Sequence, residues 1–218
     1  MNNSSLLTPN LGLPESTRVK RSLPKVQLYK RFDWKPSQRE SFDGEVSHLD
    51  FVNWIAPRTL PAIAEGAEVK EIFVIEISLK SRDFDTKSIV LLAKSIPQRV
   101  IYLLRFEEEY RLAVYHTKLF ITDWQSLTPN SSFLTLTGLT LDAVWQNIVC
   151  HIGNINSSFL IPHSSLSNLT EQIKANEERD KLLRQIAALE RQMNATKQPR
   201  RKRELFLELQ KLKQNITL

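Results

Sequence analysis

Residues 71–80 read EIFVIEISLK, the stretch of this chain with the most regular β-strand alternation. The side chains of one parity are all apolar, namely Phe73, Ile75, Ile77 and Leu79. The side chains of the other parity start apolar and end with Glu76, Ser78 and Lys80. The stretch therefore predicts a strand that buries one face completely and presents polar groups at the C-terminal end of the other face.

The flanking sequence predicts how this strand joins a sheet. Residues 99–106 read RVIYLLRF, an almost unbroken apolar run of the kind found in buried strands. Residues 83–95 have helical spacing and end before Pro97, which predicts two parallel strands joined by a right-handed crossover. Further predicted elements are helices over 36–45 (with a Ser37–Glu40 capping box) and 141–152, and strands over 46–55, 110–120 and near 121–124. This order predicts an α/β domain whose mixed sheet is flanked by helices.

Charge is distributed unevenly along the 218 residues, which carry a net charge of +6 and have a pI near 9.5. Residues 13–39 hold eight basic and two acidic residues (+6), residues 40–166 hold ten and fifteen (−5), and residues 167–218 hold twelve and seven (+5). Two basic ends around an acidic middle indicate contact with a polyanion or an acidic partner. The alternative is that exposed segments carry Lys and Arg for solubility alone.

Several classes of protein are excluded by missing motifs. The single Cys150 leaves no internal disulfide and no zinc site of several cysteines, and the four histidines lack the HxH or HxxxH spacing of a metal site. The motifs GxGxxG, GxxxxGK[ST] and GxSxG are absent, which excludes the common nucleotide-binding loops and the hydrolase elbow. No apolar run approaches about 18 residues and the N-terminus is polar, so we expect a soluble cytoplasmic protein without membrane contact.

The composition changes after Pro162, and we divide the chain into a disordered N-terminus (1–12), an α/β core (13–162) and a helical tail (163–218). The tail carries two apolar stripes with 4-3-4 spacing, formed by Leu182, Ile186, Leu189 and Met193 and by Leu205, Leu209, Leu212 and Ile216. Each stripe covers about two heptads, which is too short for a stable isolated helix in water. These eight residues are the predicted partner interface, in a helical hairpin or a coiled-coil arm; a single helix packed on its own domain is the alternative.

Two basic clusters are candidate nucleic-acid contacts. One lies between the tail stripes and comprises Lys197, Arg200, Arg201, Lys202 and Arg203. The other is a looser cluster in the N-terminal segment, where Arg18, Lys20 and Arg21 are the candidate contacts and Lys25, Lys30 and Arg31 follow. Arginine is suited to bidentate contacts with phosphates. The alternative for the tail cluster is a solvated turn whose cations lie at the end of the preceding helix, where the helix dipole favours them.

An acidic residue and a lysine at the end of a central strand are typical of restriction-endonuclease-like nucleases. In such enzymes carboxylates hold Mg²⁺, which lowers the pKa of a bound water, and the lysine stabilises the charge that develops on the phosphorane. Glu76 and Lys80 are the catalytic candidates, and Glu40, Glu45 and Asp50 are the candidate upstream acids. The pattern has an acid two residues before the lysine, where this chain has Ser78. Solvent-facing side chains or a surface ion pair are the alternative for Glu76 and Lys80.

Several segments together resemble a bacterial family of unknown function. They are the opening GLPESTRVKRSLPK with its L-P-x-S-T start, the strand at 71–80, Ile96 and Pro97 before an apolar strand, the helix LDAVWQNIV, and the leucine-spaced tail. The resemblance covers nearly the whole chain from Gly12. It implies an E-x-E-x-K strand, from which this chain departs at Ser78, and genes that neighbour DNA methyltransferases and helicases in restriction or phage-defence islands.

These observations predict an accessory or adaptor subunit of a DNA-acting defence complex. Its basic clusters are expected to contact DNA, and its tail stripes to bind a helicase, a DNA methyltransferase or a second copy of the chain. A Mg²⁺-dependent nuclease is the alternative prediction, with a mixed sheet of the restriction-endonuclease-like type. The adaptor needs no cofactor or metal, and the nuclease needs Mg²⁺.

Overall fold

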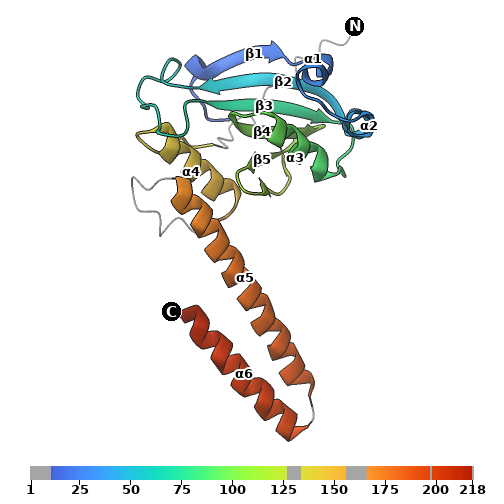
Figure 1. The fold of residues 1–218 in the computed structure, drawn as a ribbon, viewed down its shortest axis with the longest axis vertical. Helices are drawn as coiled ribbons and strands as arrows, with labels where there is room; N and C mark the ends of the chain where they lie inside the picture. Colours follow the sequence, from blue (N-terminus) through green and yellow to red (C-terminus); the bar gives the residue numbers. More distant parts are fainter. Residues whose placement is uncertain (1–10, 127–133, 156–165, 197, 218) are drawn as a thin grey trace. The chain divides into compact units, whose positions relative to one another are not determined.

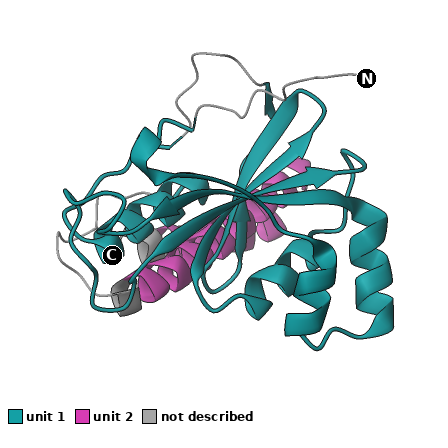
Figure 2. Cartoon of the chain, turned by 90° about the horizontal axis from the view of Figure 1, so that it is seen from above, with its two compact units in different colours: residues 1–166 teal, residues 167–218 magenta. Residues whose placement is uncertain are grey.

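The computed structural model describes residues 11–126, 134–155, 166–196 and 198–217. The chain forms two compact units, residues 1–166 and residues 167–218 (Figure 2). Residues 1–10 of the predicted disordered N-terminus lie outside the described residues. Leu11 is buried, and its carbonyl oxygen accepts a hydrogen bond of 3.0 Å from the Leu134 N–H.

A mixed sheet forms the centre of the first unit (Figure 1). Its strands lie in the order β1 (Arg18–Ser22), β2 (Val46–Ile55), β3 (Ile72–Leu79), β4 (Arg99–Phe106), β5 (Glu109–Tyr115) and β6 (Leu119–Ile121), and β7 (Gln125–Ser126) pairs with β5. Strands β3 and β4 are parallel, and the other described pairs are antiparallel. The predicted α/β class with a mixed sheet and a parallel central pair is therefore confirmed.

One face of the sheet packs against three helices, namely α1 (Lys25–Arg31), α2 (Pro36–Glu45) and α3 (Thr86–Ser95). The apolar parity of residues 71–80 lies on this face, since Ile75, Ile77 and Leu79 share one buried cluster with Phe42 of α2 and Leu92 of α3. The period-2 alternation of residues 71–80 thus predicted the buried face correctly. Before β1 the chain forms a short 3-10 helix, Glu15–Thr17.

Helix α2 begins at Pro36 and ends at Glu45, as predicted, but its capping residues differ from the prediction. The backbone N–H of Lys35, the residue before the helix, donates a hydrogen bond of 2.9 Å to the side-chain oxygen of Gln38. The capping box predicted at Ser37 and Glu40 is therefore wrong by two residues. The physical reason is Pro36, which favours the first helical position because it lacks an N–H that would need a partner there.

Helix α4 (Leu141–Ile152) contacts β5 and β6. Gly153, which follows the helix, lies against the Phe120 ring. Phe120 of β6 pairs with Val114 of β5, and neither residue belongs to the cluster that α1, α2 and α3 cover. Helix α4 therefore covers the opposite face of the sheet. The Thr140 hydroxyl caps α4 by accepting a hydrogen bond of 3.4 Å from the Ala143 N–H. At the C-terminal ends of β3 and β4 the same sheet face carries polar side chains, and there the candidate site forms.

The second unit consists of α5 (Leu166–Ala195) and α6 (Pro199–Thr217), which fold back on each other as a hairpin (Figure 1). An ion pair of 2.8 Å between Lys213 Nζ and Glu190 Oε1 joins the two helices. The stripe residues Ile186, Leu205 and Leu209 are buried. The predicted helical tail is confirmed, and it consists of two helices and not of the single helix considered as the alternative.

Among the described residues, no helix is long and apolar enough to cross a membrane.

Candidate functional site

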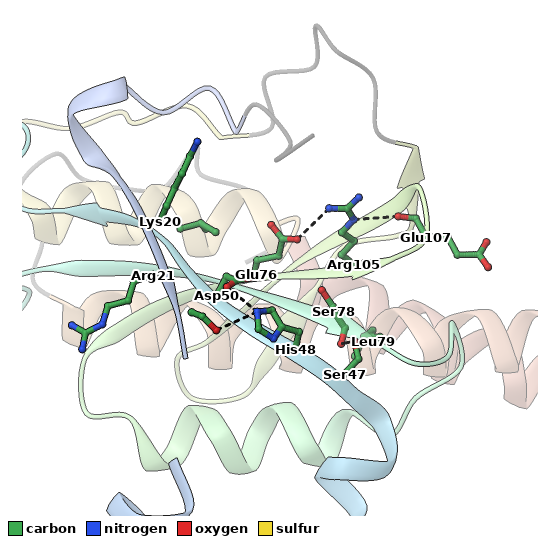
Figure 3. Close-up of a pocket in the computed structure, with 12 residues that line it drawn as sticks. Lys20, Arg21, Ser47, His48, Asp50, Glu76, Ser78, Leu79, Arg105 and Glu107 are labelled. Carbon is green, nitrogen blue, oxygen red and sulfur yellow. Dashed lines mark hydrogen bonds and ion pairs between the residues drawn. The ribbon is translucent and has the colours of Figure 1, made fainter. Parts of the chain in front are cut away.

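A pocket of about 670 Å³ opens on the sheet face at the C-terminal ends of β3 and β4 (Figure 3). Its lining combines basic, acidic and hydroxyl side chains with a few apolar ones: Lys20, Arg21, Ser22, Ser47, His48, Asp50, Val52, Glu76, Ser78, Leu79, Arg105 and Glu107. Ligands of open α/β sheets bind at the C-terminal ends of parallel strands, because the polar strand ends leave a crevice there. The position and the lining therefore make this pocket the candidate site.

Two of the acidic side chains that line the pocket occupy paired positions on neighbouring strands. Asp50 of β2 is the direct cross-strand partner of Glu76 of β3. Side chains in such a pair have Cβ atoms about 4.5–5.5 Å apart. Burial raises the pKa of Glu76, and the negative charge of Asp50 raises it further. Of the three upstream acids considered from sequence, Asp50 is the one that lines the pocket with Glu76.

Arg105 of β4 neutralises Glu76. Its Nη1 atom lies 3.4 Å from Glu76 Oε1, and its Nε donates a hydrogen bond of 3.2 Å to the Glu107 carbonyl oxygen. Only 12% of the Arg105 side chain and 9% of the Glu76 side chain are exposed, so this is an ion pair removed from solvent. The Arg105 charge lowers the pKa of Glu76 and so opposes the effect of burial. Arg105 could have been found from sequence, since it interrupts the apolar run RVIYLLRF.

His48 joins Asp50 to Ser22 of β1. Its Nε2 atom lies 3.0 Å from Asp50 Oδ1 and 3.2 Å from Ser22 Oγ. A catalytic Ser–His–Asp relay uses one imidazole nitrogen for the serine and the other for the acid. Here one nitrogen meets both groups, so the three residues do not form such a relay. His48 instead links Asp50 to β1 through one ring nitrogen.

The basic strand β1 brings part of the N-terminal cluster to the pocket. Ser22 pairs with Asp50 in the β1–β2 ladder, which places Lys20 and Arg21 among the lining residues. Both side chains are exposed, and neither forms an ion pair or hydrogen bond with any residue that the structure describes. In Figure 3 the Arg21 side chain points away from Glu76. Arg18 forms a 3.1 Å ion pair with Glu15.

Lys80 lies outside the pocket lining. Its Nζ donates a hydrogen bond of 2.6 Å to the Asp43 carbonyl oxygen near the end of α2, and its N–H donates one of 2.8 Å to the Glu45 carbonyl oxygen. The shared parity of Glu76 and Lys80 did not bring them together, because β3 ends at Leu79 and the chain turns toward α2. The structure thus brings Glu76 to the pocket and directs Lys80 elsewhere.

Three acidic residues line the pocket, and Asp50 and Glu76 are the two on paired strand positions, whereas the Glu107 carboxylate points away from Glu76 in Figure 3. Within the described ranges, no group of three or more His, Cys, Asp or Glu side chains is arranged to hold a metal ion. Mg²⁺ is commonly bound by one or two carboxylates together with substrate phosphates. Asp50 and Glu76 match that smaller requirement in number, and the exposed Lys20 adds a positive charge to the lining.

The tail cluster lies in the hairpin, at the start of α6. Arg200, Arg201, Lys202 and Arg203 follow Pro199, the first residue of the helix, and all four are exposed. Arg200 and Arg201 lie 3.7 Å and 3.1 Å from the Glu204 carboxylate. Lys202 and Arg203 have no such partner among the residues described, and Lys197 lies outside them. The cluster therefore occupies the beginning of the second helix and not the end of the first.

The predicted partner-interface residues are divided by burial. Ile186, Leu205 and Leu209 are buried, and Leu182, Leu189, Met193 and Leu212 are partly buried. The Ile216 side chain lies outside the described residues. The two stripes thus face each other within the hairpin, because the connection after α5 is short enough to return α6 along it.

Comparison with known families assigns this α/β protein with a helical tail to one family. A family model described as a domain of unknown function, DUF4391, matches residues 11–216. The chain belongs to this family, and the resemblance to an uncharacterised family is confirmed. No curated protein and no solved structure matches the chain.

Proposed function

We propose that the protein is an accessory subunit of a bacterial DNA-acting defence complex, and that it contacts DNA through its exposed cations. The observation that carries the proposal is the cluster of four adjacent basic residues at the start of α6. Positive charge is unfavourable at a helix N-terminus, where the helix dipole is itself positive. The first turn of α6 holds no acidic residue, and Glu204 of the next turn pairs with Arg200 and Arg201 but not with Lys202 or Arg203. A bound polyanion removes this repulsion, which a merely solvated turn does not.

DNA binding through this cluster has a measurable salt dependence. Each phosphate neutralised by a Lys or Arg releases counterions and adds about 0.9 to the slope of log affinity against log salt. Substitution of Arg200, Arg201 and Arg203 by Ala should lower the slope for duplex DNA by up to about three. The matched control replaces Lys174, Arg179 and Arg184 of α5, which are also exposed, with the same loss of charge. Equal effects of the two triple variants would contradict the proposal.

The defence context rests on the gene neighbourhoods that the family resemblance implies. In this proposal the tail hairpin binds a helicase, a DNA methyltransferase or a second copy of the chain. The full chain, purified from its host after nuclease treatment, should retain one such partner in a fixed ratio. Purification of the chain as a monomer without a partner would contradict the adaptor role and leave the DNA-binding test unaffected.

A Mg²⁺-dependent nuclease of the restriction-endonuclease-like type is the second candidate, favoured by the direct pairing of Asp50 with Glu76. These two carboxylates would hold Mg²⁺, which supplies a water of lowered pKa. Lys20 would stabilise the negative charge that develops on the phosphate. Lys80 has no role in this mechanism, since its ammonium group donates a hydrogen bond to the Asp43 carbonyl oxygen, outside the pocket lining.

The nuclease candidate predicts Mg²⁺-dependent DNA cleavage by the full chain. Asp50→Asn and Glu76→Gln should each abolish it. Both substitutions keep the side-chain shape, and because Glu76→Gln also removes the ion pair with Arg105, circular dichroism of each variant checks that the fold is intact. Lys80→Ala, at the end of the same strand, is the control that should keep activity. Cleavage that persists in Glu76→Gln would remove the pocket from the mechanism.

A further inference from the structure

An exposed aromatic ring lies beside the basic cluster of α6. The Phe206 side chain is 48% exposed, whereas its neighbour Leu205 and the next stripe residue Leu209 are 2% and 5% exposed. The two leucines therefore pack inside the hairpin, whereas the Phe206 ring lies at its surface. About half of the Phe206 ring is thus open to solvent, and what distinguishes it from other exposed apolar side chains is its basic surroundings.

The helical period puts this ring on the same face as two cations. Lys202 and Arg203 precede Phe206 by four and three residues, a spacing that brings Cβ atoms to about 5–6 Å on a helix surface. Both are exposed and lack an ion-pair partner among the described residues. The surface formed by Lys202, Arg203 and Phe206, here called the ring face, thus joins unpaired positive charge to an open aromatic ring.

We infer that the ring face binds single-stranded nucleic acid, with Lys202 and Arg203 on the backbone phosphates and the Phe206 ring stacked on a base. The inference rests on the proposed DNA contact of this helix and specifies which form of nucleic acid it takes. The positive charge of the ring face favours a polyanion as the ligand. The aromatic ring favours a polyanion whose bases have faces open for stacking. Bases in a duplex are stacked on each other and present only their edges, whereas single strands offer whole base faces.

The test compares two labelled probes, a 20-nucleotide thymidine strand and a 20-base-pair duplex, by fluorescence anisotropy with the full chain. Phe206→Ala should weaken binding of the single strand by about 5- to 150-fold, because each stacked base contributes an effect of that order. Binding of the duplex should change by less than about twofold, since the cations remain. Phe206→Leu should behave like Phe206→Ala, and Phe206→Trp should restore binding, because only the tryptophan variant keeps a ring.

Leu207 supplies the matched control. It is 51% exposed, as Phe206 is, but lies about 100° further round the helix and off the ring face. Leu207→Ala should leave both affinities unchanged. Circular dichroism of each variant checks that the hairpin helices are intact.

Each outcome either supports the inference or overturns it. Loss of single-strand binding that Leu matches and Trp rescues supports it. An equal loss on both probes, or no loss on either, overturns it while leaving DNA contact by the cluster in place. Binding of the duplex alone overturns it in the same way. If neither probe binds, both the inference and the proposed DNA contact are wrong. Binding of a polyglutamate peptide that is tighter than binding of either probe and depends on Phe206 would then assign the ring face to an acidic protein partner.

Discussion

Asp50 and Glu76 are direct partners across the β2–β3 ladder and place two carboxylates on one face of the sheet. Like charges directly opposite each other destabilise a sheet, and the near-complete burial of Glu76 adds to the cost. Each acid has a different neighbour, because Glu76 forms an ion pair with Arg105 and Asp50 Oδ1 lies 3.0 Å from His48 Nε2. Residues from three strands thus maintain the pair, and each can be removed separately.

Removal of Arg105 should destabilise the fold. Arg105→Gln leaves Glu76 buried without its cation, and we expect a loss on the order of 3 kcal/mol at pH 7 in urea unfolding. The pKa of Glu76, already above its ordinary value of 4.5, should rise further. A carboxyl with a raised pKa favours the folded state only while protonated, so the loss should shrink as the pH falls toward 4. The double variant Arg105→Gln with Glu76→Gln should recover part of the stability, and a fully additive result would contradict the ion pair.

Removal of Asp50 should have the opposite effect on Glu76. Asp50→Asn takes away the like charge, so the pKa of Glu76 should fall toward its ordinary value while burial keeps it raised. A ¹³C titration of the Glu76 carboxyl by NMR measures this shift. Asp83→Asn, an exposed change on the loop before α3, is the control and should leave that titration unchanged.

His116 should make the fold sensitive to mild acid. Burial lowers the pKa of His116 to about 4, and its Nδ1 accepts a hydrogen bond of 3.4 Å from Trp145 Nε1. The unfolded chain binds a proton near pH 6.5 and the folded chain does not, so stability is lost as the pH falls from 6.5 toward 4. We expect a loss of about 1–2 kcal/mol between pH 7 and pH 5. The variant His116→Gln should lack that part of the pH dependence.

Asp142 should be essential to the loop before β3. Its carboxylate accepts hydrogen bonds of 2.7 Å from the N–H groups of Ala67 and Val69, and longer ones from Glu68. Asp142→Ala leaves these donors without partners, and we expect a loss of about 2–3 kcal/mol in urea unfolding. Gly66→Ala should also destabilise, because its new Cβ would lie 2.8 Å from the Asp142 nitrogen and meet the carboxylate. Glu68→Ala, which removes only an exposed side chain, should be neutral within about 0.5 kcal/mol.

The hairpin should depend on its buried leucines. Leu209→Ala empties a site that is 5% exposed, whereas Leu207→Ala trims a side chain that is 51% exposed. Hydrogen exchange of the full chain should show faster exchange along α6 in the Leu209 variant, equivalent to about 2–3 kcal/mol. The Leu207 variant should exchange like the unchanged protein. Equal exchange in both would contradict packing of α6 on α5.

Local patterns were sufficient for most of the elements. The alternation at 71–80 predicted which side chains of β3 are buried, and the apolar run at 99–106 predicted its parallel neighbour. The two stripes of the tail predicted paired helices, since apolar side chains at helical spacing need a surface to cover them. The bounds of α2 were also predicted correctly, but its capping residues were not, because Pro36 takes the first helical position and Gln38 accepts the hydrogen bond from the Lys35 N–H.

The sequence by itself determined the fold class, the parallel strand pair, the helical tail and the identity of Glu76 as a polar residue on a central strand. Those features follow from periodicity, which acts between residues close in the chain. The tertiary structure alone decided that Asp50, and not Glu40 or Glu45, lies opposite Glu76, and that Arg105 is its cation while Lys80 turns toward α2. Strand register and side-chain direction at a sheet edge depend on contacts between residues more than twenty positions apart, and no local pattern specifies them.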